Sequence, residues 1–189
     1  MGTNVDEPIH LTDYDKAWPV LFEVEAHRLR GALSQHPVQI EHIGSTAIPG
    51  IIAKPVIDIM IGLKDWSFLG DVRQVLVAYG YEDLGEAGIS ERFYFRRRSS
   101  QAFNVHVVSL VGAHWVTNLA LRDFLRSHPL KAIGYGALKR TALQASTQML
   151  LDYSERKSAC IGDLIEQALQ WRMTTPSAVS STHPPSPPE

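Results

Sequence analysis

The sequence predicts one α+β domain in which a small mixed sheet is followed by an all-helical part. Two β-type runs stand early in the chain, at residues 38–43 and 55–63, and two more follow at residues 92–96 and 103–108. From Ala113 onward the apolar residues recur at helical spacing instead. Strands mixed with helices first, and helices alone afterwards, fit an α+β or α/β domain with a small mixed sheet.

Length and composition restrict the class of protein. The chain has 189 residues, of which 44% are hydrophobic and 20% are charged, enough for one domain with a sizeable core. The net charge of -2 argues against non-specific nucleic-acid binding. A single cysteine excludes an intramolecular disulfide. No apolar run approaches the ~18 residues of a membrane span, and none marks a signal sequence, so we expect a cytoplasmic protein without membrane contact.

The two ends differ in composition from the middle. We predict a loose N-terminus over residues 1–7, a folded domain over residues 8–173 and a disordered tail over residues 174–189. The tail reads TTPSAVSSTHPPSPPE, and Pro, Ser and Thr offer little apolar surface to bury.

The first helix is predicted over residues 14–33, with Thr12 or Asp13 as its cap and Pro19 interrupting its early part. The face that should pack on the sheet holds Val20, Leu21, Val24 and Leu29. The first strand, residues 38–43, alternates apolar and polar residues as a half-buried strand does. The second, residues 55–63, is apolar almost throughout, and Asp58 is its one charge.

Asp65 is a plausible cap for a helix through residue 79, which Gly80 ends. A short strand at 81–84 and a hairpin of 92–96 with 103–108, joined by a turn at 99–101, complete the sheet. Three helices then follow, at 113–128, 129–145 and 149–171, and Pro129 separates the first two.

The loop between the first two strands offers what a phosphate needs. Gly44, Ser45 and Thr46 supply backbone N–H groups and two hydroxyls, and Lys54 supplies a cation. Asp58 follows in a run that reads as a central strand. Burying a lone carboxylate costs several kcal/mol, so a metal, a cation or a hydrogen-bond cluster should face it.

These residues resemble the GrpB proteins of the DNA polymerase beta-like nucleotidyltransferase superfamily. The resemblance covers about residues 9–169 and implies the nucleotidyltransferase fold. It rests on Glu41-His42-Ile43-Gly44-Ser45-Thr46, Pro49-Gly50, Ala53-Lys54-Pro55, Ile57-Asp58-Ile59, Val105-His106-Val107-Val108, Leu121-Arg122-Asp123-Phe124-Leu125-Arg126, His128-Pro129, Tyr135 and Leu138-Lys139. The wider superfamily carries a pair of metal-binding aspartates on the second strand. Here Asp58 is present, but Met60 occupies the second position.

Asp58 is the strongest catalytic and magnesium-binding candidate. Glu41, on the neighbouring strand, is either a second metal ligand or a surface ion-pair partner. His42 points to the opposite face from Glu41 and is either a hydrogen-bond partner of the phosphate loop or a structural histidine. His106 is either a packed core residue or, where the resemblance places a third acidic residue, a metal ligand or general base.

Lys54, Arg122 and Lys139 are the predicted anion contacts. Arg122 is suited to a bidentate clamp on a phosphate or carboxylate, and an ion pair with a nearby carboxylate is the alternative. The run Arg96-Arg97-Arg98 is either a solvated strand end or a phosphate contact.

Three functions stay open at this point. The first is a magnesium-dependent nucleotidyltransferase acting on a nucleoside triphosphate and a small-molecule acceptor. The second keeps the ATP site and ligates an amine to a carboxylate. The third is a degenerate nucleotide-binding module, which the residues at Met60 and His106 favour. The acceptor, the nucleotide, the number of metals and the oligomeric state do not follow from the sequence.

Overall fold

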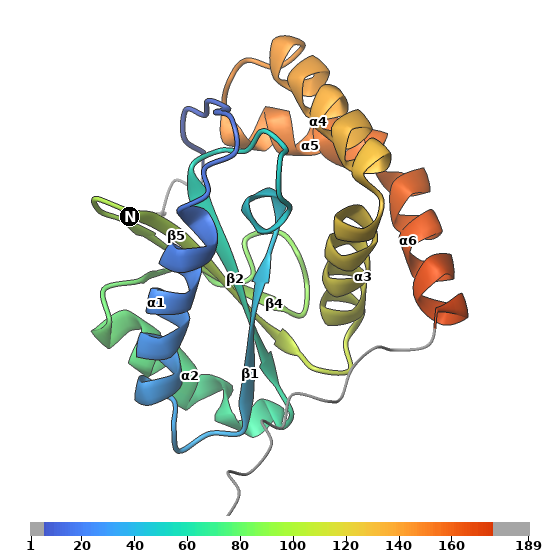
Figure 1. Ribbon diagram of the computed structural model, residues 1–189. Helices are drawn as coiled ribbons and strands as arrows, with labels where there is room; N and C mark the ends of the chain where they lie inside the picture. The colour runs from blue at the N-terminus through green and yellow to red at the C-terminus, as the bar shows by residue number, and fades with distance from the viewer. Residues whose placement is uncertain (1–5, 176–189) are drawn as a thin grey trace, which may run out of the picture.

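The computed structural model describes residues 6–175 and confirms the mixed α+β class (Figure 1). The order of strands with helices first, and helices alone afterwards, is the one expected. In chain order the elements are α1 (Trp18–Ala32), β1 (Val38–Ile43), the 3-10 helix η1 (Ser45–Ala47), β2 (Val56–Leu63), the 3-10 helix η2 (Trp66–Phe68), α2 (Leu69–Ala78), β3 (Glu82–Asp83), β4 (Arg92–Arg98), β5 (Ala102–Ser109), α3 (Ala113–Ser127), α4 (Pro129–Gln144), α5 (Leu150–Cys160) and α6 (Gly162–Thr174).

The five strands form one mixed sheet in the order β1-β2-β5-β4-β3. Strands β2 and β5 are parallel, and the pairs β1–β2, β4–β5 and β3–β4 are antiparallel. Strand β2 lies inside the sheet, between β1 and β5, and both of its faces are covered, which explains its apolar sequence. Within residues 6–175 no helix is long and apolar enough to cross a membrane.

Helices α1 and α2 cover one face of the sheet (Figure 1). The alternate residues Ile57, Ile59 and Ile61 of β2 belong to this core and are fully buried. Phe22 and Leu29 of α1 lie in the same cluster, as do Val72 and Leu76 of α2. This layer is the main hydrophobic core, and it leaves the opposite face of β2 for other contacts.

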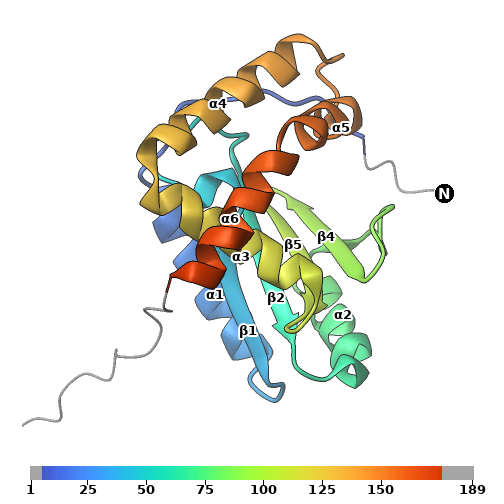
Figure 2. The same cartoon turned by 90° about the vertical axis from the view of Figure 1, so that its right-hand side faces the viewer.

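Helix α3 packs on the opposite face of the sheet, where Met60 forms a smaller cluster with Trp115 and Leu119. Gly62 makes this approach feasible, because a Cβ there would lie 2.7 Å from the Trp115 ring. Helices α4 and α6 pack on α3 in a separate helical core (Figure 2). Ile48 and Ile51 of the loop between β1 and β2 belong to this second core, so the helical part meets the sheet part at α3 and at this loop.

The first helix begins at Trp18, so the predicted start at residue 14 is wrong. Proline is favoured in the first turn, where its missing N–H costs nothing, and Pro19 lies there. Ala17 is the N-cap residue, and its N–H donates to Asp15 Oδ1. The predicted inner face is also wrong in part: Val20 and Val24 are 64% and 65% exposed, and Trp18, Phe22 and Ala26 are buried instead.

The last predicted helix, 149–171, is in fact two helices that break at Ile161. Ile161 has φ -110° and ψ 1°, outside the helical region, and Gly162 follows it. Glycine lowers helix propensity by about 1 kcal/mol, which makes this position a weak point. The predicted domain boundaries stay predictions: residues 1–5 and 176–189 of the two expected loose ends lie outside the described residues. Asp6 and Glu7 do make polar contacts with the domain.

Candidate functional site

A cavity of about 530 Å³ lies between the sheet and the helical part. The loop between β1 and β2 forms part of its wall. Two predicted site residues, Glu41 and His42, are not among those that line it. The predicted residues that do line it are Gly44, Ser45, Thr46, Lys54, Asp58, His106, Arg122 and Lys139.

The strand register explains why the polar residues of the sheet share this cavity. Alternate residues of a strand point to the same face. Asp58 is paired with Asn104, and Met60 with His106, across the parallel β2–β5 ladder. Tyr94 of β4 is in turn paired with His106. All five side chains therefore lie on the face that α1 and α2 leave uncovered.

Asp58 is partly buried, with 19% of its side chain exposed, and its Oδ1 atom accepts a hydrogen bond of 2.6 Å from Asn104 Nδ2. The same oxygen lies 3.8 Å from His106 Nε2. Burial alone would raise the pKa of the Asp58 carboxyl. His106, Lys54 and the Asn104 amide outweigh that effect and lower the pKa below its ordinary value. Asp58 is therefore a carboxylate at neutral pH.

Gly44 lets the phosphate-type loop lie against this carboxylate. Its φ of 69° and ψ of -171° belong to a region that is essentially open to glycine alone. A Cβ at this position would lie 2.5 Å from Asp58 Oδ2. The glycine that the sequence marked as a phosphate contact thus also makes room for the acidic side chain.

His42 of β1 holds the loop that contains Gly44, Ser45 and Thr46 in place. Its Nε2 atom lies 3.0 Å from Thr46 Oγ1, and its ring stacks on Phe22 with centroids 4.6 Å apart. Burial lowers the pKa of His42 to about 4, although the charge of Asp58 opposes the shift. Arg126 adds a second support by donating from Nε to the Ala47 carbonyl at 2.8 Å. His42 therefore contacts the loop and is also packed against the core, and its predicted part in phosphate binding stays a prediction.

Arg122 is engaged with carboxylates of the protein. Its Nη1 atom donates to Glu41 Oε2 at 2.6 Å and to the His42 carbonyl at 3.0 Å, and its Nε donates to Asp123 Oδ1 at 2.7 Å. Glu41 therefore lies in an ion pair, which was one of the two alternatives for it. A role for Glu41 as a metal ligand, or for Arg122 as an anion clamp, would require these bonds to open.

Three lysines from three segments supply positive charge to the cavity: Lys54 before β2, Lys139 of α4 and Lys157 of α5. Lys139 is almost fully buried, and its Nζ donates to the Ile52 carbonyl. Burial lowers the pKa of Lys139 to about 7, and the charges of Lys157 and Lys54 act in the same direction. Burial also lowers the pKa of Lys54. Within residues 6–175, none of the ion pairs includes these three lysines.

A buried hydroxyl faces the same region. Tyr153 of α5 lines the cavity, is almost fully buried, and its hydroxyl has no hydrogen-bond partner in the described part of the chain. Buried polar groups are bonded in the large majority of cases, so this hydroxyl is an unused donor in the cavity wall. Lys157 Nζ lies 5.9 Å from the centroid of the same ring. Tyr153 and Lys157 carry no signal in the sequence beyond helical spacing, because their place in the cavity depends on how α5 docks.

His106 occupies the middle of the cavity wall. Its ring stacks on Tyr94 with centroids 5.2 Å apart. Burial lowers the pKa of His106 despite the nearby Asp58 carboxylate, and the charges of Arg92 and Lys54 add to the shift. The ring is therefore neutral at pH 7 and keeps a nitrogen able to accept a proton.

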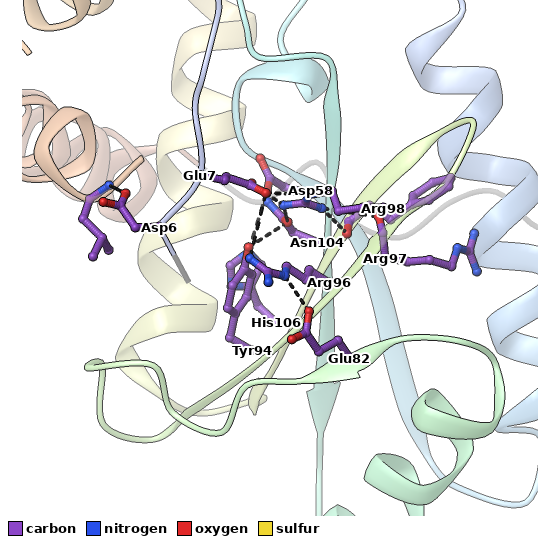
Figure 3. Close-up of polar contacts among 12 residues, drawn as sticks. Asp6, Glu7, Asp58, Glu82, Tyr94, Arg96, Arg97, Arg98, Asn104 and His106 are labelled. Atoms are coloured by element: carbon purple, nitrogen blue, oxygen red, sulfur yellow. Dashed lines mark hydrogen bonds and ion pairs between the residues drawn. The ribbon is translucent and has the colours of Figure 1, made fainter. Parts of the chain in front are cut away.

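Asn104 is a site residue that sequence reasoning did not single out. Besides its bond to Asp58, its Oδ1 accepts from Tyr94 Oη at 2.8 Å and from Arg98 Nη2 at 3.0 Å. Arg98 is held in turn by two bonds to Glu7, of 2.7 and 3.1 Å, so the contacts run from the N-terminal segment to Asp58 (Figure 3). The available signal was a lone amide within the apolar run of residues 103–108.

The arginine run on β4 is paired with carboxylates rather than left free for phosphate. Arg97 makes bonds of 2.9 and 2.7 Å with the buried Glu25, and Arg96 bonds Glu82 at 2.7 Å. Figure 3 shows Arg96 and Arg97 directed to opposite sides of the strand, as alternation requires. None of the three lines the cavity.

The donor atoms fit a magnesium ion carried in with phosphate better than one held by protein alone. Residues 6–175 contain no group of three or more His, Cys, Asp or Glu side chains arranged to hold a metal. Magnesium takes one or two carboxylates and fills its other positions with phosphate oxygens and waters. Asp58 is the carboxylate that the cavity offers for this purpose.

Comparisons with known proteins place the chain in a family. The profile of the family described as "GrpB protein" matches residues 8–167. The UPF0157 protein BH1888 of Halalkalibacterium halodurans is 32% identical over 168 residues, which are 85% of this chain and 82% of that protein. The UPF0157 protein YqkA of Bacillus subtilis is 31% identical over 160 residues, but this chain spans only 47% of its length.

A solved structure shows the same fold. The crystal structure of the conserved protein GrpB from Enterococcus faecalis is 32% identical and superposes with a TM-score of 0.78, covering 87% of this chain and 99% of that one. The glycine-bearing loop, the acidic strand and the helical end that form the cavity all fall within the residues that the family profile matches. On both sequence and structure, this chain belongs to the GrpB protein family.

Proposed function

We propose that this chain is a nucleotidyltransferase-type enzyme that uses a nucleoside triphosphate with magnesium to modify a small-molecule acceptor. The observation that carries the proposal is the charge of the cavity. Three lysines without carboxylate partners and an unpaired tyrosine hydroxyl surround a space that holds one carboxylate, Asp58. Lys139, whose pKa is about 7, gains its full charge when an anion binds beside it. The cavity therefore suits a polyanion, and a triphosphate is the common small one.

The loop that contains Gly44 is the proposed binding site for the phosphates. Gly44, Ser45 and Thr46 line the cavity beside Lys54, and the loop is held rigid by His42 and Arg126. A preorganised loop binds phosphate oxygens without the entropy cost of ordering the loop on binding. Asp58 would hold a magnesium ion whose chemistry is to neutralise and align the phosphates.

The proposed transfer is a nucleophilic displacement at phosphorus. The hydroxyl or amine of the acceptor attacks the α-phosphorus, a new bond to phosphorus forms, and the bond to pyrophosphate breaks. The proton of the acceptor goes to His106, whose neutral ring lies 3.8 Å from Asp58 and is suited to accept it. Pyrophosphate leaves with its charge compensated by Lys54, Lys139 and Lys157.

Two alternatives share the same cavity. A carboxylate acceptor would form an acyl-nucleotidyl intermediate, from which an amine displaces the nucleotide, and the overall reaction would be ligation. The single carboxylate in the cavity favours the second alternative, a module that binds nucleotide without turnover. Release of pyrophosphate alone indicates transfer, release of both pyrophosphate and nucleoside monophosphate indicates ligation, and release of neither indicates the module.

The decisive experiment is calorimetric titration with a non-hydrolysable ATP analogue, with magnesium and with a chelator. We expect binding that magnesium strengthens in the parent protein, and loss of the magnesium effect in Asp58→Asn, which keeps the shape and removes the charge. Asp71→Asn is the matched control, because Asp71 is an exposed residue of α2 that does not line the cavity. Equal magnesium dependence in the parent and in Asp58→Asn would contradict the proposal.

A further inference from the structure

Arg92 lies at the end of the cavity away from the three lysines. Arg92 is paired with Val108 across the β4–β5 ladder. Asp58 is paired with Asn104, which precedes Val108 by four residues on β5. A strand rises ~3.3 Å per residue, so about 13 Å of sheet separate the two levels. His106 lies between them. The cavity therefore has a cationic group at each end and the reactive residues in the middle.

The charge of Arg92 is not compensated inside the protein. None of the ion pairs within residues 6–175 includes it. Its Nη2 atom donates only to the backbone carbonyls of Glu86 and Ala87, at 3.1 and 3.4 Å, and its Nε atom is buried without a partner. Its Nη1 atom makes no hydrogen bond within residues 6–175 and is the donor left for an anion from outside. A second donor comes from Nη2 when one of its two carbonyl bonds opens.

The surroundings of Arg92 hold it in place and suit an organic ligand. Its guanidinium lies 5.2 Å from the centroid of the Tyr94 ring, which restricts the side chain. Thr117 and Asn118 of α3 line the cavity with hydrogen-bonding groups, and Ile89 with apolar surface. The His114 ring, 3.0 Å from the Ser90 carbonyl, ties the loop before β4 to α3.

We propose that the Arg92 end of the cavity is the acceptor subsite and binds a carboxylate group of a small organic acceptor. The assignment rests on the proposed function only in calling this second ligand the acceptor. One guanidinium carries one charge and a planar pair of N–H donors, which match a carboxylate in bidentate geometry. A dianionic phosphate would leave a net negative charge in a partly buried place, because the three lysines lie toward the Asp58 end of the cavity.

The test is an NMR titration of the full chain with propionate, with and without the non-hydrolysable ATP analogue and magnesium. We expect saturable shifts of the backbone amides of Arg92, Thr117 and Asn118, and none with the uncharged propionamide. Arg92→Gln should weaken propionate binding by about 10-fold or more, as loss of a charge-assisted bidentate pair does. Arg73→Gln is the matched control, because Arg73 also stacks on a ring, that of Phe93, but pairs with Asp83.

Arg92→Lys keeps the charge and loses the fork, so it should bind propionate better than Arg92→Gln and worse than the parent. The subsite is overturned if propionate binds equally to the parent and to Arg92→Gln, or if its shifts map elsewhere. Inorganic phosphate that outcompetes propionate at Arg92 would overturn the carboxylate assignment. Failure of the ATP analogue to bind, with propionate still shifting Arg92, would remove the proposed function and leave the anion subsite standing.

Discussion

His106 is the residue whose two possible roles predict different results for one substitution. As a proton acceptor, it should tolerate replacement by glutamine with little loss of stability, and turnover of nucleotide should fall by ~100-fold or more. As a core residue, the same replacement should cost ~1–3 kcal/mol of stability and leave turnover per folded molecule unchanged. Its ring beside Asp58 and its place in the cavity wall favour the first result. Urea unfolding and turnover measured on His106→Gln decide between them.

His42 makes stability depend on pH in a stated direction. Its pKa is about 4 in the folded protein and near the ordinary value of 6.5 when unfolded. The unfolded chain therefore binds more protons, and the folded state should lose ~1.4 kcal/mol per pH unit as pH falls from 6.5 to 4, as far as this group is concerned. Above pH 6.5, His42 is neutral in both the folded and the unfolded chain, and this loss of stability is absent.

Urea midpoints measured from pH 7.5 to pH 4.5 check this dependence. His42→Gln should flatten it, because glutamine does not titrate. His27→Gln is the matched control, since His27 is an exposed residue of α1. A slope that is the same in the parent and in His42→Gln would show that other groups cause it; His106, whose pKa is also lowered, is the first of them.

At the scale of elements, the loop between β1 and β2 can be tested through its two glycines. Gly44 and Gly50 both have a left-handed φ, of 69° and 81°, but an added Cβ meets Asp58 at Gly44 and nothing within 4 Å at Gly50. Gly50→Ala should cost ~1–2 kcal/mol for the left-handed backbone alone. Gly44→Ala should cost more by ~1–3 kcal/mol, the usual range for overpacking, and should also weaken binding of the ATP analogue.

Thermal unfolding and calorimetric titration of the two variants, side by side, provide the measurement. The difference in stability loss between the two variants has two sources. One is the ψ angle of Gly44, which only glycine adopts readily, and the other is the clash of the added Cβ with Asp58 Oδ2. Equal losses of stability, with analogue binding retained in both, would mean that the carboxylate moves aside at no cost.

The elements were predictable where local pattern decides them. The alternation at residues 38–43 and the apolar run before residue 63 fixed two strands of the sheet, and Pro129 fixed the boundary between α3 and α4. The failures have tertiary causes. Val20 and Val24 have the right spacing for an inner face, but Phe22 and Ala26 take the sheet side once the helix begins at Trp18.

The site residues also divide into those that a local sequence pattern reveals and those that only tertiary structure brings together. The loop residues and Asp58 stand close together in the sequence, so a motif reveals them. Arg92 and Asn104 lie on the two strands of one hairpin, and Lys157 lies on α5. Only the strand register and the docking of α5 bring the three to the cavity. No local pattern distinguishes such residues from ordinary polar residues.

At the scale of the molecule, the cavity joins two separately packed units. Lys54 belongs to the sheet side, and Lys139 and Lys157 belong to the helical part. A polyanion bound to all three would link the units and stabilise the whole. We expect tripolyphosphate at about 100 times its dissociation constant to raise the melting temperature by ~5–10 °C.

Lys157→Gln should reduce that shift at the same ligand concentration, whereas Lys131→Gln, on the exposed side of α4, should leave it unchanged. The shift should also shrink as salt is added, because the attraction is electrostatic. Differential scanning calorimetry at two salt concentrations measures both effects. An equal shift in the parent and in Lys157→Gln would place the polyanion elsewhere.

The contacts of the N-terminal segment bear on how this protein is cloned. Glu7 holds Arg98 with its carboxylate and the Leu150 N–H with its carbonyl, and Asp6 accepts from the Leu151 N–H. The family match begins at residue 8, so an expression clone trimmed to that match would lack both acidic residues. Arg98 would then lose its carboxylate while still bonded to Asn104, and the start of α5 would lose two tethers. Loss of activity in such a shortened protein would reflect the position of the cut rather than the chemistry of the family.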